Sequence, residues 1–278
     1  MATSKSTKKV VQSTAAPVHE TTWQPKPEDR AKANRLRLFA AISWVVAVAV
    51  ECVAIFALIL KPAVQEDPND PAMSHPFFGM LLSQNAYFGL LIALIVVAGI
   101  FAVIGSLLWK QANRLDPASE KDTVRFFIQN QLGAIITLIA FIPLVILVAM
   151  DKNMKGAQKG IATGIAAVVL IVAAAFGVST NSPSIEQYDK DTAIVMAING
   201  QDQVFWVKGG GVFHLCQESS YLNIQSKDNT IYSGTVDQAH AAGKTRLANV
   251  KECGYDPANP PAVGATNTTE PQPTDSPS

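Results

Sequence analysis

The residue whose chemistry stands out most is Glu51, an acid near the middle of a long apolar run. An ionisable side chain at the centre of a membrane span costs about 3 kcal/mol or more, so it normally faces a partner or a wet cavity. We interpret Glu51 as a protonated acid that contacts a neighbouring helix or a partner subunit. Proton or cation handling is the alternative, although the predicted spans hold no second acidic or basic residue to complete a relay.

The C-terminal part of the chain holds a second set of reactive side chains: His214, Cys216, His240 and Cys253. These residues supply the atom types of a zinc site, but their spacing is irregular and no Cys-x-x-Cys is present. A disulfide between Cys216 and Cys253 is another interpretation, which requires an oxidising compartment. Unpaired thiols are the third. We predict no metal site and leave the state of the cysteines open.

No pattern of catalytic residues emerges from the sequence. Gly243-Lys244-Thr245 follows a predicted helix, whereas a phosphate-binding loop would precede one. The four histidines lie outside the apolar runs, so haem ligands at membrane depth are missing. Lysine plus arginine equals aspartate plus glutamate at 22 each, which gives no indication of a nucleic-acid partner. We therefore predict a protein that is not an enzyme and carries no cofactor.

Four apolar runs must position these residues. The chain has 278 residues, of which 49% are hydrophobic and only 16% charged, and a helix needs about 20 apolar residues to cross a bilayer. The predicted spans cover residues 38–60, 87–109, 126–150 and 160–178, which makes residues 38–178 a four-helix transmembrane domain. Residues 1–37 and 257–278 are rich in small polar residues and proline, and we predict that both are disordered tails.

The fourth span carries Gly160 and Gly164 at a spacing that lets helix backbones approach closely. This pair is suited to packing within the bundle and equally to packing against other membrane subunits.

The basic residues near the span ends predict the orientation. Arg30, Lys32, Arg35 and Arg37 precede the first span, which predicts a cytoplasmic N-terminus in a multi-pass protein of the plasma membrane. An even number of spans then returns the C-terminal domain to the cytoplasm. Lysines in the third loop and the threonine- and proline-rich C-terminal tail favour the opposite side for that domain.

Residues 192–254 have the pattern of a small α+β domain. We expect strands at 193–198, 204–207 and 212–216 and a helix that begins with a capping box at Thr235 and Gln238 and ends at Gly243. The predicted fold is therefore an α-helical membrane protein with four transmembrane helices followed by a small α+β domain.

Residues 204–207 (Val-Phe-Trp-Val), 212–216, 231–235 and 239–244 of this domain resemble the C-terminal domains of a group of actinobacterial four-span membrane proteins. That group includes the accessory subunit of the corynebacterial complex III–complex IV (cytochrome bc–aa oxidase) respiratory supercomplex. The resemblance covers most of residues 31–255 and defines no catalytic residues. It implies an accessory role beside respiratory complexes.

Three functions remain as hypotheses. The first is a non-enzymatic membrane accessory or scaffold protein whose partners are the lipid bilayer and other integral membrane subunits. The second is a small transporter or channel that uses Glu51. The third is a membrane-tethered sensor whose C-terminal domain binds a ligand or a metal.

Overall fold

The computed structural model describes residues 9–12, 23–65, 73–154, 156–226 and 228–255. It divides into two compact units. One comprises residues 22–188, and the other comprises residues 1–21 together with 189–278.

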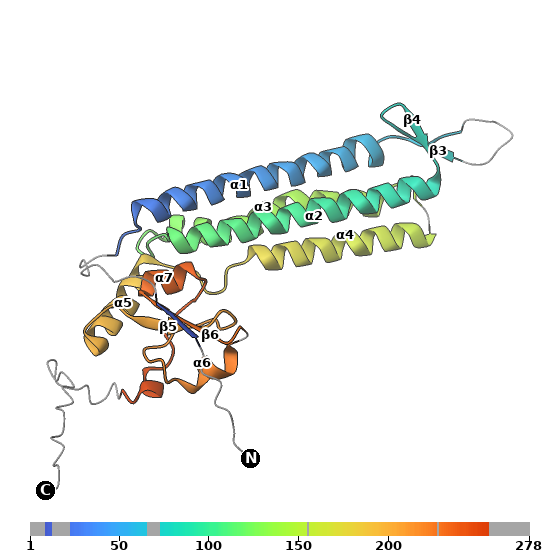
Figure 1. Cartoon of the computed structure of the whole chain (residues 1–278). Helices are drawn as coiled ribbons and strands as arrows, with labels where there is room; N and C mark the ends of the chain where they lie inside the picture. Colours follow the sequence, from blue (N-terminus) through green and yellow to red (C-terminus); the bar gives the residue numbers. More distant parts are fainter. Residues whose placement is uncertain (1–8, 13–22, 66–72, 155, 227, 256–278) are drawn as a thin grey trace, which may run out of the picture. The chain divides into compact units, whose positions relative to one another are not determined.

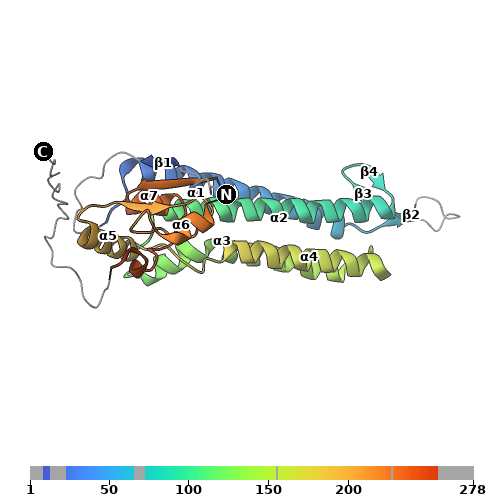
Figure 2. The same cartoon turned by 60° about the horizontal axis from the view of Figure 1, so that its bottom comes forward.

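The first unit is a bundle of long apolar helices that run side by side (Figures 1 and 2). Its elements are α1 (Pro27–Val53), which continues into the π-helix η1 (Ala54–Ile59), α2 (Gln84–Leu115), α3 (Thr123–Met150) and α4 (Gly156–Gly177). All four are long and apolar enough to cross a membrane. The predicted fold class, an α-helical protein with four helices able to span a membrane, is therefore confirmed.

The helices begin and end outside the apolar runs because polar side chains continue or cap them. Pro27 occupies the first turn of α1, where its missing N–H costs nothing. The helical part of residues 1–37 therefore starts at Pro27, where we expected a disordered tail. Ser83 caps α2 by accepting a hydrogen bond from the Ala86 N–H, and Asp122 caps α3 by accepting one from the Arg125 N–H.

Small residues set the distance between the helices. A Cβ built on Gly133 of α3 would lie only 3.2 Å from Cα of Gly177 on α4. Gly99 of α2 meets Val169 of α4 in the same way, and Gly105 of α2 meets the indole of Trp44 on α1. Glycines therefore allow close contacts between the helices, with backbone between α3 and α4 and with side chains at Gly99 and Gly105.

The loop between α1 and α2 forms a small sheet of β2 (Val64–Gln65), β3 (Met73–Phe77) and β4 (Met80–Leu82), in that order. Phe77 pairs with Met80, so β3 and β4 are joined by the two residues Phe78 and Gly79. Both have positive φ, 43° and 83°. Two positive φ values are what a tight two-residue hairpin turn requires.

The second unit is a small α+β domain with the sheet order β1-β6-β5. The strands are β1 (Lys9–Gln12), β5 (Val204–Trp206) and β6 (Thr230–Gly234), and the helices are α6 (Ser220–Gln225), α7 (Val236–Ala241) and the 3₁₀ helix η2 (Val250–Cys253). Helix α5 (Ile185–Asn199) leads into this unit from the bundle. The predicted capping box of Thr235 and Gln238 is confirmed at the start of α7.

Two predictions about this sheet were wrong. Residues 193–198 belong to helix α5 and not to a strand. Tyr188, Asp191, Thr192 and Val195 are all buried, and this three- to four-residue spacing is that of a helix face. Residues 212–216 make only isolated bridges, from Phe213 and His214. The other two strands of the sheet are instead β6, which pairs antiparallel with β5, and β1 of the N-terminal tail, which lies parallel to β6.

Candidate functional site

The buried face of α1 carries Glu51. Ala40, Trp44, Ala47, Ala54 and Leu58 lie on this face at helical spacing, and Glu51 falls between them with only 4% of its surface exposed. Its Oε1 has no hydrogen-bond partner among the described residues. Glu51 is therefore packed inside the bundle, and its role as a polar contact to a neighbouring helix stays a prediction.

The predicted glycine pair lies on the outer surface of the bundle, whereas Glu51 is buried inside it. Gly160 and Gly164 are exposed on α4, and a Cβ built on either would meet no atom within 4 Å. Large apolar residues share this open side of the helix: Ile161, Val168, Ile171 and Val172. In the apolar stretch of α4, only 22% is buried inside the protein, whereas the apolar stretches of the other three helices are 33–39% buried.

Within the bundle, the glycines that pack helices are Gly99, Gly105, Gly133 and Gly177. Sequence reasoning missed Gly99, Gly105 and Gly133 because each contacts a residue on another helix and none is part of a four-residue repeat. Gly160 and Gly164 therefore present an unused close-packing surface on α4, which we call the α4 glycine face together with Ile161, Val168 and Ile171.

A polar network connects the loops at the β3–β4 end of the bundle. Tyr87 donates a hydrogen bond to Asp151 Oδ2 at 2.6 Å. His75 Nε2 lies 2.8 Å from Gln84 Oε1, and Gln84 donates to the carbonyl of Asn153 at 3.1 Å. Asn153 in turn donates to the carbonyl of Lys61 at 2.9 Å. The network thus fixes the α1–α2 loop and the α3–α4 loop relative to one another.

In the second unit, Cys216 and Cys253 form a disulfide with a Cα–Cα distance of 5.7 Å. Next to it, His214 Nδ1 lies 3.0 Å from Glu252 Oε2, and Ser219 donates to the same carboxylate oxygen at 3.0 Å. Burial lowers the pKa of His214, and the hydrogen bond and charge of Glu252 oppose that shift.

This Ser-His-Glu cluster does not have the geometry of a nucleophilic triad. Ser219 Oγ lies 3.2 Å from the same ring nitrogen, Nδ1, that contacts Glu252. In a triad, the hydroxyl and the acid contact different nitrogens of the ring, so that the proton can pass across it. The cluster therefore joins the segment after β5 to η2 and does not activate Ser219.

The four zinc-ligand candidates do not converge. Both sulfurs are bonded to each other, and His214 faces Glu252. His240 Nδ1 lies 2.9 Å from the Lys244 carbonyl, and its Nε2 lies 3.4 Å from Asp191. Among the residues that the structure describes, no group of three or more His, Cys, Asp and Glu is placed to hold a metal.

Lys244 has a structural position that sequence reasoning missed. Its side chain is buried, and Nζ donates to the carbonyls of Val207 at 2.7 Å and Gly210 at 2.6 Å. The lysine of the apparent phosphate motif therefore binds the backbone of the glycine turn at 209–211. A buried lysine satisfied by carbonyls is a structural anchor, because its donors are already used.

The sequence matches no protein-family model, and comparisons with curated proteins and with solved structures give no match either.

Proposed function

We propose that this protein is a non-enzymatic accessory or scaffold subunit of the membrane, and that it binds another integral membrane protein through the α4 glycine face. The observation that carries the proposal is the exposure of Gly160 and Gly164 with open space above both. Transmembrane helices associate where small residues let two backbones approach, because lipid supplies no hydrophobic driving force between helices.

Other glycines of the bundle already pack against a neighbouring helix, whereas Gly160 and Gly164 do not. Gly133 and Gly177 are already in close contact with each other's helices. The α4 glycine face offers the same type of contact to a helix from outside the chain, flanked by Ile161 and Val168.

Respiratory complexes are the first candidates for the partner, on the basis of the resemblance of the C-terminal domain. We place the protein in the plasma membrane with its N-terminus in the cytoplasm, because Arg30, Lys32, Arg35 and Arg37 precede the first span. β1 of the N-terminal tail pairs with β6 after the last span, which supports an even number of crossings.

The proposal is tested by purification in mild detergent followed by mass spectrometry. The wild-type chain should recover subunits of a cytochrome bc complex or of an oxidase in constant ratio. Gly160→Leu combined with Gly164→Leu should abolish that recovery, because the leucines keep the backbones apart. Gly89→Leu is the matched control, since Gly89 is also exposed with open space around it, on α2. Recovery of the wild-type chain alone, or equal recovery with the double variant, would contradict the proposal.

A small transporter that uses Glu51 is the second candidate. The observation that favours it is the buried carboxyl whose Oε1 lacks a partner among the described residues. If reconstituted vesicles showed an ion or solute flux that Glu51→Gln abolished, the scaffold function would be wrong.

A further inference from the structure

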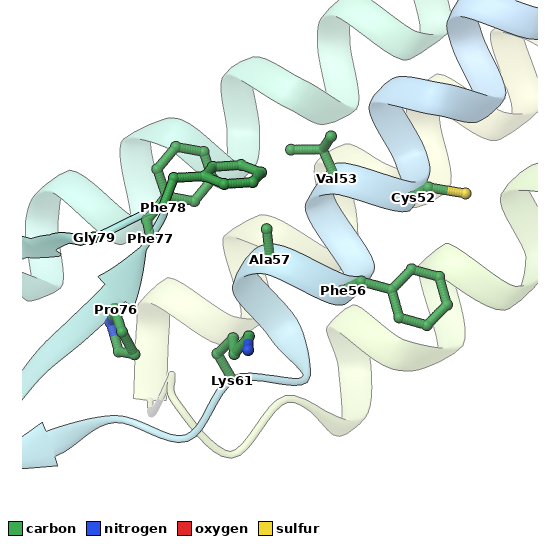
Figure 3. A pocket seen from close by; sticks show the side chains of 9 residues that line it. All are labelled: Cys52, Val53, Phe56, Ala57, Lys61, Pro76, Phe77, Phe78 and Gly79. Atoms are coloured by element: carbon green, nitrogen blue, oxygen red, sulfur yellow. The ribbon is translucent and has the colours of Figure 1, made fainter.

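An apolar groove lies between the C-terminal end of the first span and the β3–β4 hairpin (Figure 3). Its volume is about 590 Å³, within the range of roughly 300–1,000 Å³ that is typical of small-molecule sites. The helix wall runs from Cys52 to Lys61, and the four residues from Pro76 to Gly79 form the hairpin wall. Lys61 is the one charged residue in the lining.

The groove extends inward from the membrane surface. Lys61 follows the last residue of η1 by two positions, so it lies where the span ends. Cys52 is nine residues earlier, or about 13 Å deeper along a helix that rises 1.5 Å per residue. Phe78 and Gly79 line the same cavity as Cys52 and Val53, as Figure 3 shows. The hairpin turn therefore lies beside the part of the helix that precedes its C-terminal end.

The outer side of the hairpin is apolar as well. Phe78 is 74% exposed, Met80 58% and Leu81 49%. Three large apolar side chains exposed together indicate contact with lipid and not with water. The hairpin therefore lies at the level of the outermost acyl chains.

The hairpin wall is held in place by the polar network. His75 of β3 is 2% exposed and stacks on Tyr87, with ring centroids 4.3 Å apart. Its Nε2 lies 2.8 Å from Gln84 Oε1. Because these contacts fix the hairpin to the start of α2, the groove is preformed and does not depend on a ligand to create it.

The middle of the helix wall is the π-helix η1, and at its end the Leu60 N–H bonds to the carbonyl of Ile55, five residues earlier. Such wide turns occur often at functional sites. Phe56 and Ala57, both in this segment, are among the residues that line the cavity.

We propose that the groove binds an acyl chain of an anionic phospholipid whose phosphate lies beside Lys61. The apolar lining excludes a polar ligand, and the depth of the groove matches an acyl chain that enters from the surface. Lys61 is exposed and makes no ion pair with any residue that the structure describes. A single cation at the mouth of an apolar groove selects a negative headgroup over a zwitterionic one.

The test is native mass spectrometry of the full chain, purified in detergent with equal amounts of phosphatidylglycerol and phosphatidylcholine of identical chains. We expect one retained lipid, with phosphatidylglycerol preferred about fivefold. Lys61→Gln should remove the preference while the fold persists, because Asn153 binds only the backbone carbonyl of Lys61. Lys152→Gln is the matched control, an exposed lysine in the turn at the same end of the bundle, and should keep the preference.

A second pair of variants tests the groove itself. Ala57→Phe should fill the cavity and abolish retention of both lipids. Val45→Phe, at a 68% exposed position elsewhere on α1, should leave retention unchanged. Phe56→Trp adds a fluorophore to the lining, and phosphatidylglycerol with brominated chains should quench it more than brominated phosphatidylcholine.

Three results would overturn the proposal. The first is equal retention of the two lipids by the wild-type chain, and the second is an equal loss of preference in Lys61→Gln and Lys152→Gln, which would indicate surface charge alone. The third is a dimer that Ala57→Phe dissociates, since a second copy of the chain would then occupy the groove.

Discussion

The hydroxyl of Tyr87 at the start of α2 lies 2.6 Å from Oδ2 of Asp151 at the end of α3, and both residues are at least 98% buried. The contact joins the α1–α2 loop to the α3–α4 loop, because Tyr87 also stacks on His75 and Asp151 also accepts from the Asn153 N–H. The end of the bundle that holds the lipid groove is therefore organised around one hydrogen bond between two helices.

Removing this hydrogen bond should destabilise the bundle. Tyr87→Phe leaves Oδ2 of the buried Asp151 without the Tyr87 hydroxyl that donates to it, and a buried polar atom without its partner costs about 1–3 kcal/mol. The unfolding temperature in detergent should fall accordingly. Tyr221→Phe removes a hydroxyl at a 49% exposed position and should leave that temperature unchanged. Equal unfolding temperatures for Tyr87→Phe and wild type would show that the contact is not formed.

The opposite end of the bundle has its own connection, between α1 and the end of α2. Arg37 donates to Asp116 Oδ2 at 2.6 Å and to the Asp116 carbonyl at 2.8 Å. The pair is half-buried and charged, so we expect Arg37→Gln to lower the free energy of unfolding by about 1–3 kcal/mol.

Chemical denaturation of the purified chain measures the effect of Arg37→Gln. Arg35→Gln is the control, because Arg35 is exposed two positions earlier on the same helix. An equal effect of the two substitutions would mean that the basic charge matters and the contact with Asp116 does not.

The cysteines can be counted by mass-tagged maleimide after denaturation. If Cys216 and Cys253 are bonded as in the structure, one tag should attach without reductant, at the free Cys52, and three after reduction. The bond closes a loop across 37 positions, so its reduction should destabilise the second unit by about 3–4 kcal/mol. Three tags without reductant would show that the thiols are free in the cell.

This count also tests the orientation of the protein. Disulfides persist in oxidising compartments, whereas the basic residues before the first span favour the cytoplasm for both termini. A single tag would favour an exported second unit and contradict the orientation that we propose. Three tags would agree with it.

The stability of the second unit should depend on pH through His214. Burial lowers the pKa of His214 below its ordinary value of about 6.5, with opposition from Glu252. The unfolded chain therefore binds the proton more readily than the folded one. Above about pH 6.5, His214 is neutral in both states and does not alter the free energy of unfolding. Below that pH, the free energy of unfolding should decrease, because protons bind the unfolded chain preferentially.

Denaturation between pH 8 and pH 5, followed by tryptophan fluorescence, measures this dependence. His214→Gln should remove the part of it that His214 causes while keeping a side chain able to hydrogen-bond Glu252. The same decrease in wild type and variant would assign the pH dependence to other groups.

The spans could be predicted from sequence because four long apolar runs leave few alternatives for backbone hydrogen bonding in lipid. The ends of the helices could not be predicted in the same way. Residues 27–37 look like a polar tail, but Arg37 forms a half-buried contact with Asp116 that only the folded bundle brings together. The misassigned segment 193–198 is apolar throughout and half of its residues are β-branched, as in a strand. Its helical character appears only when the buried Tyr188 and Asp191 are included in the period.

The candidate sites show the same limit. Glu51 and the Gly160–Gly164 pair could be found because an acid in an apolar run and a four-residue glycine repeat are local signals. The lipid groove could not, because its two walls are separated in sequence and meet through the contact of His75 with Tyr87 and Gln84.

The parallel pairing of β1 with β6 has a consequence for how the chain is made. β1 leaves the ribosome first, whereas the strand that receives it is completed about 220 residues later, after the last span. The sheet of the second unit therefore cannot close until all four helices have been inserted. An arrangement of this kind delays maturation of the domain until insertion is complete, and a bulky fusion at the N-terminus should slow that final step.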